Sequence, residues 1–180
     1  MSVLDGPIST GWDGEIGVAS RYYEAMVDVS PFLWFDDHAE QALEFYARVF
    51  ANSEIINVTR MDVPTSPNGG FVIGTIRIEN LTLTIMNGGP TFALSEAFSL
   101  FVSCQDQAEV DFYWLSLGEG GEPGQCGWLK DQFGLSWQII PRLLSELWSD
   151  PDPEKSGRVR DAMMAMGKIE CNKLQAAYDA

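Results

Sequence analysis

A few polar side chains lie on the mixed faces of predicted strands in two parts of the chain, and these are the first candidates for contact with a ligand. Gln138 and Ser136 alternate on one predicted strand, Thr84 and Met86 alternate on another, and Ser99 lies on a third. Side chains two residues apart on a strand point to the same face of a sheet. A few hydroxyl and amide groups among apolar neighbours are what usually orient a small molecule in a pocket. The pattern therefore predicts a ligand-binding wall, with a hydrogen-bonded polar core as the alternative for Gln138.

Aromatic side chains accompany this polar row. Phe32 and Trp34 lie on the first predicted strand, Phe101 lies on the strand that carries Ser99, and Trp128 precedes the last strand. Aromatic walls suit a planar or apolar small molecule. The alternative is that these four side chains are ordinary core residues.

Two residues are weaker candidates for catalysis. Cys126 lies in the segment Gly124–Trp128, and a thiol in a cavity is a possible nucleophile, although the sequence places no His or Lys beside it to lower its pKa. A buried, unreactive Cys126 is the alternative. Glu96 precedes the strand of Ser99 and is a candidate base at the mouth of the cleft.

Composition excludes several classes of protein. The chain is 46% hydrophobic and 12% aromatic, which is typical of a globular protein. Its formal charge of −15 argues against binding to nucleic acid and to anionic membrane surfaces. No apolar run approaches the roughly 20 residues of a membrane helix, and no charged-then-apolar leader predicts secretion. Three widely spaced cysteines without a CxxC pair indicate reduced thiols, so we expect a cytoplasmic protein.

The elements that must position these residues occur twice. Residues 33–46 run from a strand into a helix, and residues 100–113 repeat this pattern at an offset of 67 residues. Farther on, residues 83–86 match residues 135–138 at an offset of 52. Both later strands alternate an apolar face with a mixed face, and the offset superimposes these faces. Two mixed faces that meet would form a cavity.

The predicted fold is α+β, with duplicated βαβββ units forming a curved mixed sheet around a cleft, followed by a C-terminal helical tail. The first unit has a strand at 29–35, a helix begun by Asp36 or Asp37 and ending near Phe50, a strand at 53–62, and a hairpin of 71–78 and 81–87. The second has a strand at 97–104, a helix at 107–117, and a hairpin of 126–131 and 134–140; glycines replace the early strand. Helices are expected at 145–148, 152–166 and 172–178.

The chain is thus divided into three parts. Residues 1–28 are expected to be a flexible extension with a short helix at 21–26, and residues 29–141 the duplicated domain, with halves at about 29–90 and 96–141. Residues 142–180 are a tail that packs on the domain or on a partner subunit.

Several segments carry a family resemblance: Pro31–Phe35, Glu44–Tyr46, Asn87–Pro90, Cys126–Asp131, Phe133–Gln138 and Ser149–Lys155. Together they resemble the vicinal oxygen chelate superfamily (glyoxalase, bleomycin-resistance and dioxygenase proteins), and most closely its PhnB-like branch. The resemblance extends over residues 29–178 and implies the fold described above. It also implies a homodimer, because members commonly complete their clefts by dimerising.

The resemblance further implies where a metal would bind. Members of the superfamily typically hold a catalytic ion with His and Glu, two ligands from each half. Here the ligand positions correspond to Met86, Gln138, residues 30–32 and Ser99, and none of them is His, Asp or Glu. We therefore expect no metal site and no cofactor. The single histidine, His38, is interpreted as a solvated residue at a helix start.

Members of this branch are often labelled 3-demethylubiquinone-9 3-methyltransferase. Enzymes that use S-adenosylmethionine usually have a glycine-rich turn between a strand and a helix. Gly88-Gly89-Pro90 follows a strand, but residues 91–93 lead toward another strand. Methyltransferase activity is therefore not expected.

Three functions remain open. The first hypothesis is a protein that binds a small apolar or planar molecule in a metal-free cavity, comparable to the sequestering bleomycin-resistance relatives. The second is an enzyme with glyoxalase- or dioxygenase-like chemistry. The third is a non-catalytic dimeric interaction protein that meets its partner through an acidic surface.

Overall fold

The computed structural model of this chain describes residues 27–62 and 70–180. The helix predicted at 21–26 lies outside these residues. Residues 27–31 have no regular structure, so the first strand is shorter than predicted. Within the described residues, no helix is long and apolar enough to cross a membrane.

The first unit is a four-stranded sheet with one helix. Its elements are β1 (Phe32–Phe35), α2 (Ala39–Val49), β2 (Ser53–Asp62), β3 (Gly70–Ile78) and β4 (Leu81–Asn87). The strand order is β1-β4-β3-β2, with β1 parallel to β4 and the other pairs antiparallel. The predicted hairpin across Glu79-Asn80 is confirmed as β3–β4.

The second unit repeats this arrangement. Its elements are β5 (Ser99–Cys104), α3 (Gln107–Gly118), β6 (Glu122–Pro123), β7 (Trp128–Lys130) and β8 (Ser136–Pro141), in the order β5-β8-β7-β6. In β1–β4, Phe32 pairs with Thr84, and in β5–β8, Ser99 pairs with Ser136. Both pairs are related by the offsets of 67 and 52 residues, so the predicted repeat is confirmed in register as well as in order.

The prediction that the second unit lacks the early strand is wrong, because β6 is present as a strand of two residues. Its flanking glycines explain why it is short. A Cβ on Gly121 would lie 2.1 Å from the Lys130 carbonyl oxygen, and one on Gly124 would lie 2.8 Å from that of Trp128. Where the backbone passes this close to β7, only glycine fits. Glycine has no side chain to pack and therefore weakens a strand.

The start of α2 also differs from the prediction. The N-cap is His38, in the left-handed conformation with φ 66° and without a side-chain cap. Asp37 instead accepts a hydrogen bond from the His38 backbone N–H at 2.7 Å. Helix α3 has the expected type of cap, since Asp106 accepts a bond from the Glu109 N–H at 3.0 Å.

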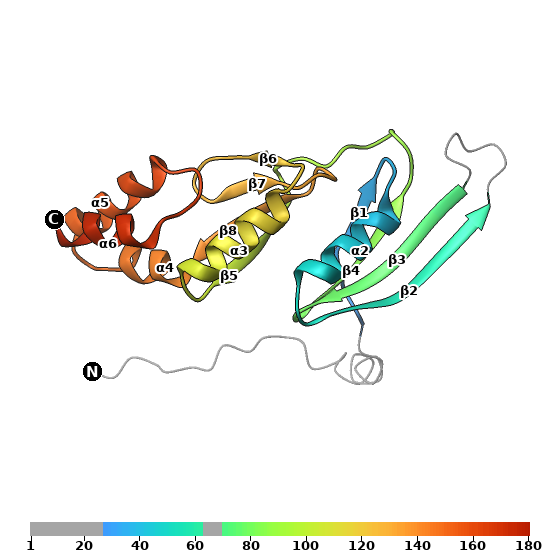
Figure 1. The fold of residues 1–180 in the computed structure, drawn as a ribbon, viewed down its shortest axis with the longest axis horizontal. Helices are drawn as coiled ribbons and strands as arrows, with labels where there is room; N and C mark the ends of the chain where they lie inside the picture. Colours follow the sequence, from blue (N-terminus) through green and yellow to red (C-terminus); the bar gives the residue numbers. More distant parts are fainter. Residues whose placement is uncertain (1–26, 63–69) are drawn as a thin grey trace, which may run out of the picture.

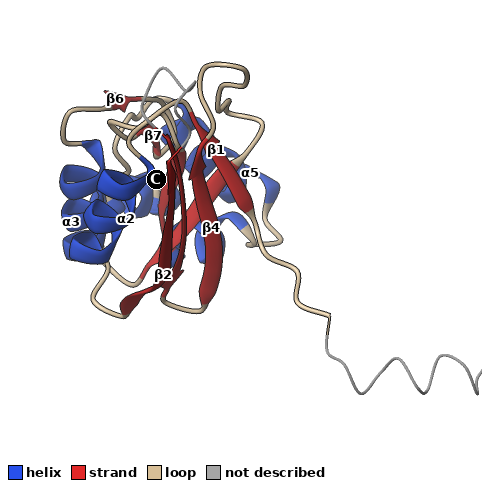
Figure 2. Ribbon diagram, turned by 90° about the vertical axis from the view of Figure 1, so that its right-hand side faces the viewer, coloured by secondary structure: helices blue, strands red, loops and turns tan. Residues whose placement is uncertain are grey.

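Both helices lie on the same side of the strands, as Figure 2 shows. The apolar faces of the strands pack beneath them, and Leu83, Ile85, Leu135 and Trp137 are buried as the strand alternation predicts. We call the opposite side of each sheet its open face. Figure 1 shows the two sheets side by side along the long axis of the molecule. The predicted single curved sheet is thus divided into two.

An aromatic cluster joins the two units on the helix side. Phe50, after α2, stacks on Tyr113 of α3 with ring centroids 5.2 Å apart and on Trp137 of β8 at 5.6 Å. Tyr46 meets the edge of Trp137 at 5.5 Å. The buried residues of both units therefore form one continuous core.

Beyond β8 the chain forms the expected helical tail, with α4 (Arg142–Trp148), α5 (Pro153–Met164) and α6 (Cys171–Asp179). Val159 and Met163 are buried on α5, which ends before the predicted residue 166, and Met166 and Ile169 are buried in the connection to α6. The tail has its own apolar cluster and packs at the end of the molecule next to the second unit (Figure 1).

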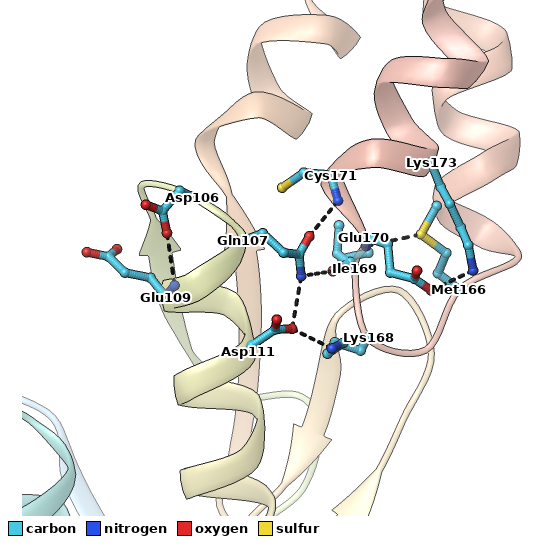
Figure 3. A network of polar contacts seen from close by, with 10 residues as sticks. All are labelled: Asp106, Gln107, Glu109, Asp111, Met166, Lys168, Ile169, Glu170, Cys171 and Lys173. Carbon is cyan, nitrogen blue, oxygen red and sulfur yellow. Dashed lines mark hydrogen bonds and ion pairs between the residues drawn. The ribbon is translucent and has the colours of Figure 1, made fainter.

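Gln107, at the start of α3, holds the tail in place (Figure 3). Its Nε2 donates to the Ile169 carbonyl at 3.1 Å and to Asp111 at 3.0 Å, and its Oε1 accepts from the Cys171 N–H at 2.7 Å. Lys168 completes the network through an ion pair with Asp111. One amide thus joins the second unit to the connection between α5 and α6.

Candidate functional site

The open face of the second sheet brings together most of the candidate residues of that half. Paired residues on adjacent strands share a face, so Phe101, Gln138 and Trp128 form one row across β5, β8 and β7. Ser99, Ser136 and Lys130 form the next row. Gln138 donates from Nε2 to the Ser99 Oγ at 2.8 Å, which joins the two rows. Phe101 is 58% exposed, so this face is accessible.

The open face of the first sheet holds the remaining candidates. Phe32 pairs with Thr84, and Trp34 pairs with Met86. Thr84 lies 3.3 Å from the Thr75 hydroxyl of β3, oxygen to oxygen. Phe32 is 57% exposed. The two groups of candidates lie on separate sheets that stand side by side, so one chain does not bring them face to face across a cavity.

The glycines after β4 have a packing role. Trp34 donates from Nε1 to the Gly89 carbonyl at 2.8 Å, and a Cβ on Gly88 would lie 2.3 Å from the Trp34 ring. Residues 88–98 are an irregular segment that ends at β5, as expected, and no helix follows the glycines. Gly88 is therefore explained by its close approach to Trp34, and the turn lacks the helix N-terminus that a nucleotide site would use.

A cavity of about 120 Å³ lies beside β7, and Ser136 is part of its wall. The wall also includes Trp128, Lys130, Glu96 and Glu122. Lys130 Nζ forms an ion pair with Glu96 Oε1 at 2.6 Å. The Glu96–Lys130 hydrogen bond is the largest cause lowering the pKa of Glu96, so this carboxylate is a poor candidate for the predicted base.

Ser136 is unusual within this wall. Its side chain is 1% exposed, and among the described residues its hydroxyl has no hydrogen-bond partner. A buried hydroxyl without a partner has a free-energy cost, and such groups are uncommon in folded proteins. Ser136 is therefore the candidate residue whose hydrogen-bonding capacity is unused within the described residues.

Lys130 and Glu122 were not predicted from the sequence. The signal was present for Lys130, because it lies two residues after Trp128 on a strand and so shares its face. No such signal existed for Glu122. It pairs with Lys130 through β6, a strand that the glycine-rich sequence did not predict.

The inherited metal positions do not fit a metal ion. The four positions are occupied by Phe32, Met86, Ser99 and Gln138, and the Gln138 amide nitrogen donates to Ser99. A thioether, a phenyl ring, a hydroxyl and an amide do not form a donor set for a catalytic divalent ion. Within 27–62 and 70–180, no group of three His, Cys, Asp or Glu residues is placed to hold one.

Cys126 differs from the expected buried thiol. It is half-buried in a turn with φ 57°, and its Sγ lies 3.6 Å from Met164 Sδ. Its backbone N–H donates to the Met166 carbonyl at 2.7 Å. Cys126 thus contacts the tail, whereas Cys104 is completely buried at the end of β5. His38 is exposed, as predicted, in the wall of a separate cavity beside α2.

A buried carboxylate behind the site connects the two units. Asp131 Oδ2 accepts from Tyr46 Oη at 2.7 Å and from Trp137 Nε1 at 2.8 Å, and Oδ1 accepts from the N–H groups of Phe133 and Leu135 at 2.9 and 3.0 Å. Burial raises the pKa of Asp131, and these hydrogen bonds oppose the rise. Burial and the Asp131 charge together raise the pKa of Tyr46, so its hydroxyl stays a donor.

Comparison with solved structures gives several similar chains. A PhnB protein from Bacillus cereus, described with the same methyltransferase label, is 27% identical over 64% of this chain and 99% of its own, with a TM-score of 0.58. Protein PA1353 from Pseudomonas aeruginosa is 16% identical over 64% of this chain and 97% of its own, with a TM-score of 0.51. The fosfomycin resistance protein FosX from Listeria monocytogenes is 18% identical over 63% of this chain and 89% of its own, with a TM-score of 0.48.

No curated protein matches the chain. The sequence profile of the family described as 3-demethylubiquinone-9 3-methyltransferase matches residues 27–140, which span both βαβββ units and stop before the tail. The chain therefore belongs to this family, within the PhnB-like branch of the vicinal oxygen chelate superfamily.

Proposed function

We propose that this protein binds a small planar or apolar molecule on the open face of its second sheet, without a resident metal. The observation that carries the proposal is the hydrogen-bonded pair of Gln138 and Ser99 beside the exposed ring of Phe101. The Gln138 Nε2 and the Ser99 Oγ are 2.8 Å apart, which fixes the amide. An oriented amide and hydroxyl next to an accessible ring are suited to hold a flat ligand and set its orientation.

A second copy of the chain would complete the site. The two open faces carry Phe32 and Phe101 with more than half of each side chain exposed. Exposed apolar surface of this kind often marks an interface. If the first sheet of one copy covers the second sheet of the other, then Phe32, Trp34, Thr84 and Met86 lie opposite Ser99, Phe101, Trp128 and Gln138. We propose this homodimer as the binding form.

Catalysis is not part of this proposal. The family label names a methyl transfer, but the segment after β4 is occupied by the packing of Trp34 on Gly88 and Gly89. The two candidate catalytic groups are engaged elsewhere, Glu96 with Lys130 and Cys126 with Met164. In the described part of the open faces, no donor set supports the hypothesis of a glyoxalase-like enzyme.

A thermal-shift screen of planar and hydrophobic compounds tests the proposal. A ligand that binds the native state at 100 times its Kd stabilises it by about 2.7 kcal/mol, which raises the melting temperature by several degrees. Gln138→Ala and Phe101→Ala should each reduce this shift. Gln41→Ala, an exposed glutamine on α2, is the matched control and should leave the shift unchanged.

Light scattering on the same samples tests the dimer, which Phe101→Ser should weaken. A ligand whose shift is the same in Gln138→Ala, Phe101→Ala and the control would place binding elsewhere and refute the proposed site. Metal-dependent turnover of a ligand from the screen would favour the enzyme instead.

A further inference from the structure

We propose that the cavity beside β7 binds the ammonium group of an organic cation whose apolar part lies on the open face. This inference rests on the proposed function and names the chemical class of its ligand. The cavity of about 120 Å³ is lined by Glu96, Glu122, Gly124, Trp128, Lys130 and Ser136, among others. That volume is well below the roughly 300 Å³ of a typical pocket for a drug-sized ligand, so it suits one end of a ligand.

The charges in the wall favour a cation. Glu96 and Glu122 supply two carboxylates, and Lys130 supplies one ammonium group. Lys130 pairs with Glu96 at 2.6 Å and lies opposite Glu122 in the register of β6 and β7. A second ammonium group would bring this wall to neutrality. An anion would add a third negative charge around a single lysine, in a chain whose net charge is already −15.

The hydroxyl of Ser136 is the second, independent observation. It is buried in the wall with no partner among the described residues, and its lone pairs accept hydrogen bonds. An ammonium group carries three N–H donors and no acceptor. Ser136 and Glu122 would accept two of these donors, so a ligand would satisfy a polar atom that the protein itself does not.

Trp128 supplies the connection to the open face. It belongs both to the wall of the cavity and to the row that contains Gln138 and Phe101. The face of an indole ring attracts a cation within about 6 Å of the ring centroid. A ligand with its ammonium group beside Trp128 would therefore place its apolar part toward Phe101.

Three probes of nearly equal shape separate the possibilities: phenethylamine, 2-phenylethanol and phenylacetate. They share a phenyl ring and a two-carbon chain, and they present a cation, a neutral hydroxyl and an anion. Isothermal titration calorimetry at fixed ionic strength should give phenethylamine a Kd about tenfold lower than that of 2-phenylethanol, since one charge-assisted hydrogen bond is worth about 1.4 kcal/mol more than a neutral one. Phenylacetate should bind most weakly.

Two variants locate the effect. Glu122→Gln should remove most of the preference for phenethylamine and leave 2-phenylethanol unchanged, whereas Glu119→Gln, an acid at the end of α3 outside this wall, should change neither. Ser136→Ala should weaken phenethylamine binding and also raise the melting temperature of the ligand-free protein, because it removes a buried hydroxyl without a partner. A residue of purely structural importance would lower that temperature.

Equal affinity for the three probes, lost in Gln138→Ala, would overturn the cation assignment while the proposed function stands. A preference for phenethylamine that survives Glu122→Gln would also overturn it, because net charge alone would then explain the binding. No binding of any probe would refute the assignment, and the compound screen above would then decide the proposed function separately.

Discussion

At the scale of single residues, Asp131 is a buried carboxylate that connects the two units. It accepts four hydrogen bonds, one of them from Tyr46 of the other unit across 85 positions of sequence. Both oxygens of its carboxylate are acceptors, so the group accepts hydrogen bonds on both sides. An amide at this position would direct an NH₂ group at either the indole N–H of Trp137 or the two backbone N–H groups.

Asp131→Asn should therefore destabilise the fold by about 2 to 3 kcal/mol, because buried donors lose a charged acceptor. For a chain of this length, that corresponds to a melting temperature lower by roughly 5 to 10 °C. Denaturant unfolding followed by circular dichroism measures the change. Asp161→Asn, on the exposed surface of α5, is the control and should stay within about 0.5 kcal/mol of the parent. A similar loss in both variants would show that the buried network contributes little.

At the scale of elements, the joint between α3 and the tail depends on Gln107. Gln107→Ala removes the acceptor of the Cys171 N–H and the donor to the Ile169 carbonyl, and Ile169 is completely buried. We expect a loss of about 1 to 2 kcal/mol that is confined to the tail. Amide hydrogen exchange should accelerate in α6 and stay unchanged in α2. Equal acceleration in both helices would mean that the tail is not a separate unit of stability.

The same joint should respond to acid. Hydrogen bonds from Lys168 and Gln107 hold the pKa of Asp111 below its ordinary value, so the folded state favours the ionised form. Stability from this group is present in full above the ordinary aspartate pKa of about 3.9 and is lost as the pH falls through the lowered folded value. The side chain is 42% exposed, so the effect is small.

After correction for intrinsic rates, exchange in α6 should therefore rise between about pH 5 and about pH 3. Asp111→Asn should remove this dependence. Persistence of the same pH dependence in that variant would assign it to another carboxylate.

The elements were predictable from the sequence because their signals are local. The period-two alternation of Leu83 and Ile85 identified the buried face of β4, and the offset of 52 residues transferred it to Leu135 and Trp137. Where the signal was weak, the prediction failed. The two residues of β6 are too few to show a period, and the start of α2 depends on the left-handed backbone of His38, which the hydrophobic pattern did not indicate.

Of the site residues, only those related by strand alternation or by the repeat could be predicted from the sequence. Alternation placed Gln138 and Ser136 on one face, and the repeat aligned Ser99 with Phe32. The buried pairing of Tyr46 with Asp131 and the ion pair of Lys130 with Glu96 depend on contacts between distant residues, which a single sequence does not show. The side-by-side arrangement of the two sheets depends on the same contacts.

At the scale of the whole molecule, the net charge of −15 opposes the proposed dimer. Two such chains repel each other, and salt screens the repulsion beyond a Debye length of about 10 Å at 0.1 M. Raising sodium chloride from about 20 mM to about 300 mM should therefore lower the dimer Kd several-fold, because the apolar open faces are not weakened by salt. Sedimentation velocity measures it, with Phe101→Ser as the control. A dimer that weakens with salt would be held by opposite charges instead.

Tyr46 of the first half donates a hydrogen bond to Asp131, in the turn between β7 and β8 of the second half. The tyrosine at the equivalent position of the second half faces the first half in turn. Tyr113 is the residue that the repeat aligns with Tyr46, and burial together with the charge of Glu79, in the turn between β3 and β4, raises its pKa. Tyr113 also stacks on Phe50 of the first unit, so each half presents its helix tyrosine to the other half, as identical protomers do about a twofold axis. The chain thus resembles two half-units that are joined covalently and related by approximate twofold symmetry. The second half departs most from this symmetry at β6. An assembly of two chains would be a pseudo-tetramer, and its two ligand sites would be equivalent to each other while each combined two different halves.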